Sequence, residues 1–178
     1  MRKYLVPTRG TGDAETAAAL TVLAQILGDG VTSRFAQALE LGEKTAISTG
    51  AWYPETRRDA AGFTIYGVPA QGVSLDEIED GLDRELDRIK ADGPTVEELE
   101  RVKRLKRASM IYAQDSQTTL ARRYGSGRAI GLSIEEIEAW PDHIADVTAE
   151  DVRRVAAEYL VPERAVTGRL VRAEKEQG

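Results

Sequence analysis

The chain has 178 residues, a formal net charge of −6 and no cysteine, with 42% hydrophobic and 30% charged residues. This length fits one domain with a sizeable core, and the lack of cysteine excludes disulfides and thiolate metal sites. Charges of both signs are interleaved without a basic patch, which disfavours nucleic acid as a partner, and no apolar run reaches the roughly 20 residues that span a bilayer.

The chain begins with a short extended segment over residues 3–8, followed by a helix over residues 14–27. Asp13 has the residue type and position of an N-cap. The helix is apolar on nearly all sides, so we expect it to be the central packing element. Gly28 is predicted to end it in a left-handed conformation.

A glycine-rich turn then leads to a second helix that opens at residues 33–35. Residues 44–53 alternate with period two, so Ile47, Ala51 and Tyr53 are predicted on one face of a strand and Trp52 on the other. Residues 61–68 alternate again, with Phe63 on one face, and the two strands are predicted to form an antiparallel hairpin.

The second half of the chain reads as helices marked by four capping boxes, Ser74…Glu77, Thr95…Glu98, Ser133…Glu136 and Thr148…Asp151. The helix from residue 96 carries a thin apolar stripe that includes Leu99, Val102, Leu105 and Tyr112. Pro141 is predicted to kink or end the helix after residue 133. Residues 164–172 alternate as a final strand. The segregated strands and helices predict a single α+β domain over residues 1–178, an antiparallel or mixed β-sheet with helices packed on one face.

Catalytic chemistry is sparse in this sequence. His143 is the only histidine, and one histidine without cysteine cannot form a zinc site. The inverted His-x-x-Glu-His motif and the Gly-x-Ser-x-Gly motif are both absent. Paired carboxylates such as Glu97-Glu98 lie in first helical turns, where they favour the helix dipole. We therefore expect no catalytic residue and no metal ligand set in this chain.

The turn at residues 28–34 leads into a helix and could expose backbone N–H groups to a phosphate. It follows a helix, however, and lacks both the lysine of a P-loop and the third glycine of a dinucleotide fingerprint. A small binding module with a ligand at this turn is the weakest of the functional hypotheses.

Three stretches in order resemble the pitrilysin-like (insulinase-type) zinc peptidases, which include the mitochondrial processing peptidase. They are residues 27–35 (Leu-Gly-Asp-Gly-Val-Thr-Ser-Arg-Phe), 93–103 (Gly-Pro-Thr-Val-Glu-Glu-Leu-Glu-Arg-Val-Lys) and 147–152 (Val-Thr-Ala-Glu-Asp-Val). Residues 159–162 (Tyr-Leu-Val-Pro) match as well. The resemblance covers nearly the whole chain.

This resemblance implies the C-terminal, non-catalytic half of a two-domain peptidase, which packs against a homologous zinc-bearing domain and helps enclose a peptide substrate. Zinc is then expected only on the partner domain. The family's non-catalytic domain often carries an Arg and, seven positions on, a Tyr that hold the substrate backbone. Aligning the pattern from Leu39 onward places Glu40 and Ile47 at those positions, so either the register shifts in the turn at residues 41–43 or the pair is lost. Glu40 repels the negative charge that such a pair would stabilise, and Ile47 has no donor, so a wall and packing interface is expected.

The resemblance leaves a second hypothesis open, a structural or assembly domain like the family's respiratory-chain core subunits, without peptidase activity. On the paired-domain hypothesis, a half removed from its partner is expected to self-associate, as a possible homodimer, or to expose an apolar patch. The patch is predicted to include some of Trp52, Tyr53, Phe63 and Tyr66, and Ser33, Arg34, Trp52 and Tyr53 are the interface or loop candidates. The compartment stays open, with the bacterial periplasm or cell envelope as one candidate for the parent protein.

Overall fold

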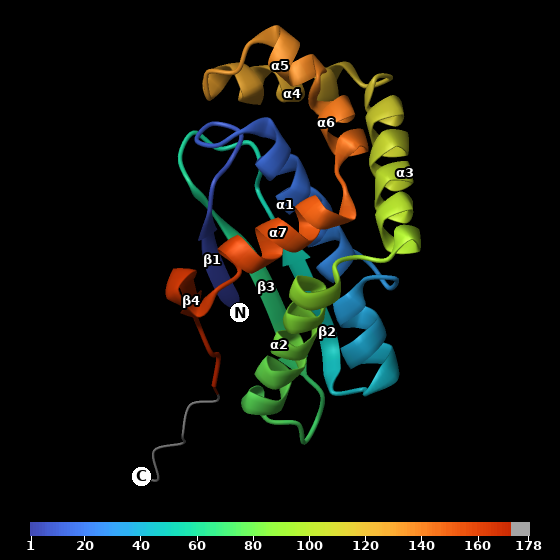
Figure 1. The fold of residues 1–178 in the computed structure, drawn as a ribbon, viewed down its shortest axis with the longest axis vertical. Helices are drawn as coiled ribbons and strands as arrows, with labels where there is room; N and C mark the ends of the chain where they lie inside the picture. Colours follow the sequence, from blue (N-terminus) through green and yellow to red (C-terminus); the bar gives the residue numbers. More distant parts are fainter. Residues whose placement is uncertain (172–178) are drawn as a thin grey trace.

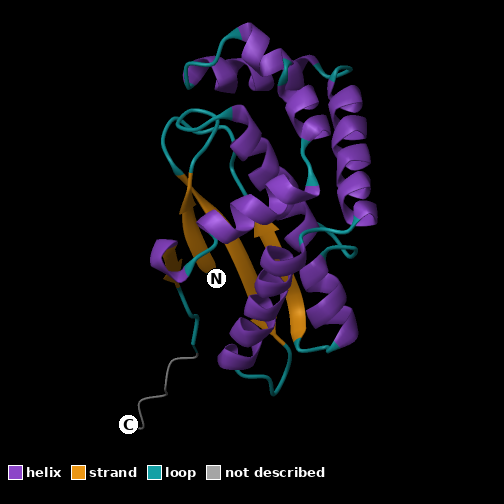
Figure 2. Cartoon of the chain, viewed as in Figure 1, coloured by secondary structure: helices purple, strands orange, loops and turns teal. Residues whose placement is uncertain are grey.

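The fold, described over residues 1–171 of a computed structural model, is a four-stranded sheet with helices on one face (Figures 1 and 2). The strands are β1 (Arg2–Val6), β2 (Ala46–Trp52), β3 (Ala61–Pro69) and β4 (Ala165–Thr167). They lie in the order β2-β3-β1-β4, and every neighbouring pair is antiparallel. The predicted α+β class and the β2–β3 hairpin are thereby confirmed.

Helix α1 (Ala14–Gly28) is the central packing element, as predicted. Eleven of its 15 residues are buried, so it has almost no solvated face. It packs against β2 and against the helices α3 (Val96–Ala113), α6 (Trp140–Asp146) and α7 (Ala149–Tyr159). Asp13 caps its N-terminus by accepting a hydrogen bond of 2.6 Å from the Thr16 amide.

The prediction for Gly28 is wrong. Gly28 lies inside α1, and the positive φ of this turn, 75°, belongs to Gly30. Glycine at position 28 serves a close approach instead. A Cβ there would lie 1.9 Å from the backbone nitrogen of Ala51, so the end of α1 can touch the backbone of β2 only without a side chain.

A seven-residue π-helix, η1 (Ala36–Gly42), connects α1 to β2 and lies beside that strand. The register of β2 against β3 shifts between Ala46 and Ser48, which leaves Ile47 unpaired as a β-bulge. Residues 46 and 51 are consequently both buried, although simple alternation places them on opposite faces. The prediction that Ile47 shares a face with Ala51 is wrong for this reason, and Ile47 is 67% exposed.

Four of the helices begin where the predicted capping boxes place their starts. All four capping boxes are formed, with the side chain and backbone of each cap bonded reciprocally. Pro141 does not kink a helix but stands in the first turn of α6, where its missing N–H costs no hydrogen bond. The other helices are α2 (Leu75–Asp92), α4 (Gln117–Ala129), α5 (Ile134–Glu138) and a 3₁₀ turn, η2 (Pro162–Arg164).

Two local expectations fail in the C-terminal half. The apolar stripe of α3 is buried only at Leu99 and Val102, whereas Leu105 and Tyr112 are 57% and 75% exposed. The second half of α3 therefore extends beyond the core together with α4 (Figure 1). The final strand is only three residues long, and residue 172 of the predicted strand lies outside the described residues.

Candidate functional site

The corner where η1 meets β2 holds the two positions that the family resemblance marks for substrate contact. Glu40 points towards β2, and one of its carboxylate oxygens accepts hydrogen bonds of 2.6 Å from both the amide and the hydroxyl of Thr49. Ile47 projects outward from the bulge and carries no hydrogen-bond donor. This corner therefore offers no side-chain donor to a peptide carbonyl at either position.

Arg34 is held by an ion pair that connects the start of η1 to the start of α3. Its Nε and Nη2 donate to the two oxygens of Glu98 at 2.7 and 2.8 Å, and Nη2 also donates to the Gly93 carbonyl at 2.9 Å. The two side chains are only 14% and 17% exposed. Burial opposes ionisation of Glu98, but the hydrogen bonds from Arg34 and Thr95 outweigh it and hold the pKa of Glu98 below its usual value.

The turn at residues 28–34 is also a candidate phosphate-binding site, and its geometry does not favour that role. Ser33 is 2% exposed, and the Arg34 guanidinium is already bonded to Glu98 and a carbonyl. The adjacent hollow of about 590 Å³ is lined by the carboxylates of Glu85, Asp92 and Glu98 beside two arginines. Three carboxylates repel an anion, so this hollow is poorly suited to phosphate.

Two of the four aromatic residues predicted for an exposed patch lie on the face of the sheet opposite the helices. Trp52 is 43% exposed, and its ring lies 6.0 Å from the half-buried ring of Tyr66. Gly50 leaves room for Tyr66, because a Cβ at position 50 would lie 2.4 Å from the tyrosine ring. The prediction that some of the four lie at the surface therefore holds for Trp52 and Tyr66 and not for the other two. Tyr53 and Phe63 are 7% and 0% exposed in the core, since the strand directs them towards the helices.

The side chains of Ser33 and Tyr53 are also buried, so in the folded chain they cannot contact a partner. The Tyr53 hydroxyl donates to the Pro7 carbonyl at 2.7 Å, and burial raises the pKa of Tyr53. Of the predicted interface candidates, Trp52 alone is exposed, at 43%, while Arg34 is occupied by its ion pair.

Sequence reasoning missed the aliphatic part of this surface. Leu5 of β1 is 59% exposed because Tyr4 and Val6 on either side of it point into the core, an alternation visible in the sequence. Val166 pairs opposite Lys3, which no local pattern reveals. We define the open sheet face as the large apolar side chains on this side, which are Leu5, Trp52, Tyr66, Val68 and Val166.

The metal-binding potential of the chain is low in the described residues. His143 borders a hollow of about 170 Å³ with the acidic residues Glu15, Asp146 and Asp151, but over residues 1–171 no three potential ligands are grouped to hold an ion. A single imidazole without thiolates does not fit the two-histidine zinc site of the peptidase motif. Among the helices of residues 1–171, none combines the length and apolar character that crossing a bilayer requires.

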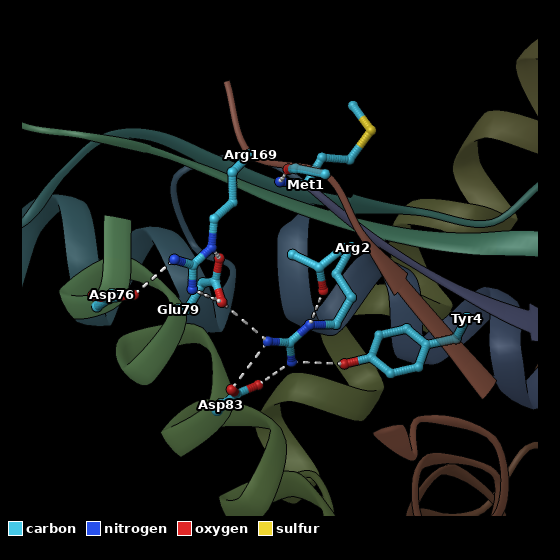
Figure 3. A network of polar contacts seen from close by, with 9 residues as sticks. Met1, Arg2, Tyr4, Asp76, Glu79, Asp83 and Arg169 are labelled. Carbon is cyan, nitrogen blue, oxygen red and sulfur yellow. Dashed lines mark hydrogen bonds and ion pairs between the residues drawn. The ribbon is translucent and has the colours of Figure 1, made fainter. Parts of the chain in front are cut away.

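A network of ion pairs ties β1 and the segment after β4 to helix α2 (Figure 3). Arg2 is paired with Asp83 and lies 3.7 Å from Glu79, and Arg169 bonds Glu79 at 2.7 and 2.9 Å and Asp76 at 2.9 Å. The hydrogen bonds from Arg169 hold the pKa of Glu79 below its usual value. These contacts fasten β1 and the segment after β4 to the helical layer, which is a structural role.

Comparison with known families and structures gives one family and several solved structures with a similar fold. Residues 4–106 match the family described as the peptidase M16 inactive domain. No curated protein matches the chain. The inactive peptidase domain of a candidate zinc protease from Bordetella parapertussis has a similar fold, with a TM-score of 0.83 and 23% identity over 99% of this chain and 91% of that one.

Longer proteins contain the same fold as one part. A protease from Helicobacter pylori aligns with a TM-score of 0.83 and 19% identity, over 92% of this chain but only 38% of that chain. A peptidase M16 inactive domain from Pseudomonas fluorescens aligns with a TM-score of 0.79 and 18% identity, also over 92% and 38%. The chain thus spans well under half the length of these two proteins.

Proposed function

Since the chain belongs to the peptidase M16 inactive-domain family, we propose that it is the non-catalytic half of a zinc peptidase assembly. In this role it packs against a homologous domain that carries the zinc and helps to enclose a peptide. The zinc and the hydrolytic residues are supplied by the partner domain, because the histidine and carboxylates within residues 1–171 do not form such a ligand set.

The observation that carries this proposal is the open sheet face. Leu5, Trp52, Val68 and Val166 are between 43% and 76% exposed on one side of the sheet, while the helices cover the opposite side. One face of an antiparallel sheet often stays exposed to water, but its side chains are then mostly polar. Here large apolar side chains from all four strands stand beside Lys3 on that face. Clusters of exposed apolar side chains of this kind commonly mark interfaces between proteins or domains.

A second function, an assembly domain without peptidase activity, is favoured by a different observation. Glu40 is bonded to Thr49 and Ile47 has no donor, so the substrate-polarising pair of the family has no equivalent at these positions. In this case the open sheet face still binds a homologous domain, but no peptide is cleaved by the complex.

Co-expression with a zinc-bearing domain tests both functions. The domain to use is one that carries His-x-x-Glu-His in the parent chain or in an adjacent gene. Trp52→Glu places a charge on the open sheet face and is expected to abolish co-purification, because an unpaired charge in an apolar interface is strongly unfavourable. Leu105→Glu on α3 is the matched control, since Leu105 is 57% exposed and lies outside the open sheet face.

Cleavage of fluorescently quenched casein by the purified complex separates the two functions. Zinc-dependent cleavage by the complex, and none by either half, supports the peptidase function. Co-purification without cleavage favours the assembly function. If Trp52→Glu and the wild type bind the zinc-bearing domain equally well, the open sheet face is not the interface and the proposal fails.

A further inference from the structure

The outer edge of β2 is the second place where this domain could bind another chain. β2 is the first strand in the order β2-β3-β1-β4 and pairs only with β3, so one row of its backbone groups faces away from the sheet. Unpaired edges of this kind accept additional strands from other molecules. Residues 45–53 contain no charged residue and no proline, which gives the edge none of the usual protection within the strand.

We propose that Glu40 seals this edge from outside the strand, so that β2 does not accept a strand from a second copy of the chain. The Thr49 amide donates to Glu40 at 2.6 Å instead of pairing across the sheet, which places this donor on the outer edge. The Thr49 hydroxyl donates to the same carboxylate oxygen, also at 2.6 Å. An incoming strand would have to replace two charge-assisted hydrogen bonds and would bring its carbonyl oxygen against a carboxylate.

The π-helix η1 and the bulge in β2 together position the Glu40 side chain against Thr49. η1 lies beside β2, and Glu40 stands near its C-terminal end, from where its side chain reaches a residue nine positions further along the chain. The bulge at Ile47 leaves one residue of β2 without a partner just before Thr49 and twists the strand locally. The position at which the family resemblance expects a substrate-binding arginine is thus used to close an edge. This inference concerns the edge of β2 and is independent of the proposed function.

Hydrogen exchange of the Thr49 amide in the purified chain tests the inference directly. Glu40→Ala removes the acceptor, and exchange at Thr49 is expected to accelerate by about 10- to 100-fold, which is the range for losing one hydrogen bond to a charged group. Glu43→Ala is the matched control, because Glu43 follows the same helix but its carboxylate bonds the exposed Arg84. The control is expected to leave exchange at Thr49 unchanged.

Sedimentation velocity over a range of concentrations measures the consequence. Glu40→Ala is expected to associate at lower concentrations than the wild type or Glu43→Ala. Adding Ile47→Lys, which places a charge on an exposed side chain at the same edge, is expected to reverse that gain. The core amide of Leu23 in α1 reports global unfolding.

Three results would overturn the inference. Thr49 could exchange equally fast in the wild type and in Glu40→Ala. Thr49 and Leu23 could accelerate by the same factor, which would make the effect a general loss of stability. The double variant could associate as strongly as Glu40→Ala alone, which would place the association elsewhere.

Discussion

The ion pair between Arg34 and Glu98 gives a quantitative prediction for the stability of the fold. The two side chains are 14% and 17% exposed and share two hydrogen bonds of 2.7 and 2.8 Å. Breaking a fully buried pair by removing one partner costs about 3–5 kcal/mol. Since this pair keeps some exposure and Glu98 retains its hydrogen bond to the Thr95 amide, we expect Arg34→Ala to cost about 2–3 kcal/mol.

Thermal unfolding monitored by circular dichroism checks this value. For a domain of this size, a loss of 2–3 kcal/mol corresponds to a decrease in Tm of roughly 5–10 °C. Arg153→Ala is the control, because the Arg153–Glu150 pair has similar hydrogen bonds but 42% and 67% exposed side chains. Pairs at such exposure contribute little to stability, so the control is expected to melt close to the wild type.

The stabilisation by the Arg34–Glu98 pair should also depend on pH, in a direction that the pKa of Glu98 fixes. The folded-state pKa of Glu98 lies below its ordinary value of 4.5, so the stabilisation is fully present above that pH and is lost as the pH falls through the folded-state pKa. The difference in Tm between the wild type and Arg34→Ala should be constant from pH 7 to about pH 5.5 and should shrink below about pH 4.5. Equal Tm values for Arg34→Ala and Arg153→Ala, or a difference that grows in acid, would refute this reasoning.

Three further predictions concern other parts of the fold. Gly28→Ala forces a Cβ to 1.9 Å from the Ala51 nitrogen and should destabilise the fold by about 3 kcal/mol or more. Gly125→Ala meets no atom within 4 Å and should stabilise the fold by up to about 1 kcal/mol. Urea unfolding measures both changes. Arg169→Ala should lower Tm in low salt and have little effect in 1 M NaCl, because its pairs with Glu79 and Asp76 are exposed to screening; an effect independent of salt would contradict this. The isolated chain should bind no stoichiometric zinc and cleave no casein, which elemental analysis and a cleavage assay check.

Local interactions explain which parts of the fold the sequence predicts. A capping box joins residues three positions apart, so Ser74, Thr95, Ser133 and Thr148 could be assigned from their neighbours alone. The role of Gly28 could not, because the atom that it must avoid lies 23 positions away in the chain, at Ala51. Local patterns therefore place the elements but not the contacts between them.

The same distinction applies to the candidate site. Alternation along residues 44–53 correctly separated Trp52 from Tyr53, since both lie beyond the bulge. It failed at Ile47, because a bulge depends on how two strands pair and not on the composition of one of them. The hydrogen bond from Thr49 to Glu40 crosses from a strand to a π-helix, and the sequence gives no periodic signal for such a contact.

Two of the stretches that carry the family resemblance contact each other in the fold. Arg34 from residues 27–35 binds Glu98 from residues 93–103, and Arg101 donates to the Thr32 carbonyl at 2.9 Å. These residues join the turn after α1 to the start of α3, and neither pair requires a metal or a substrate. The similarity of these stretches to a peptidase therefore reflects packing requirements of the domain. It predicts the architecture without predicting hydrolysis, which depends on a metal-ligand set that residues 1–171 do not form.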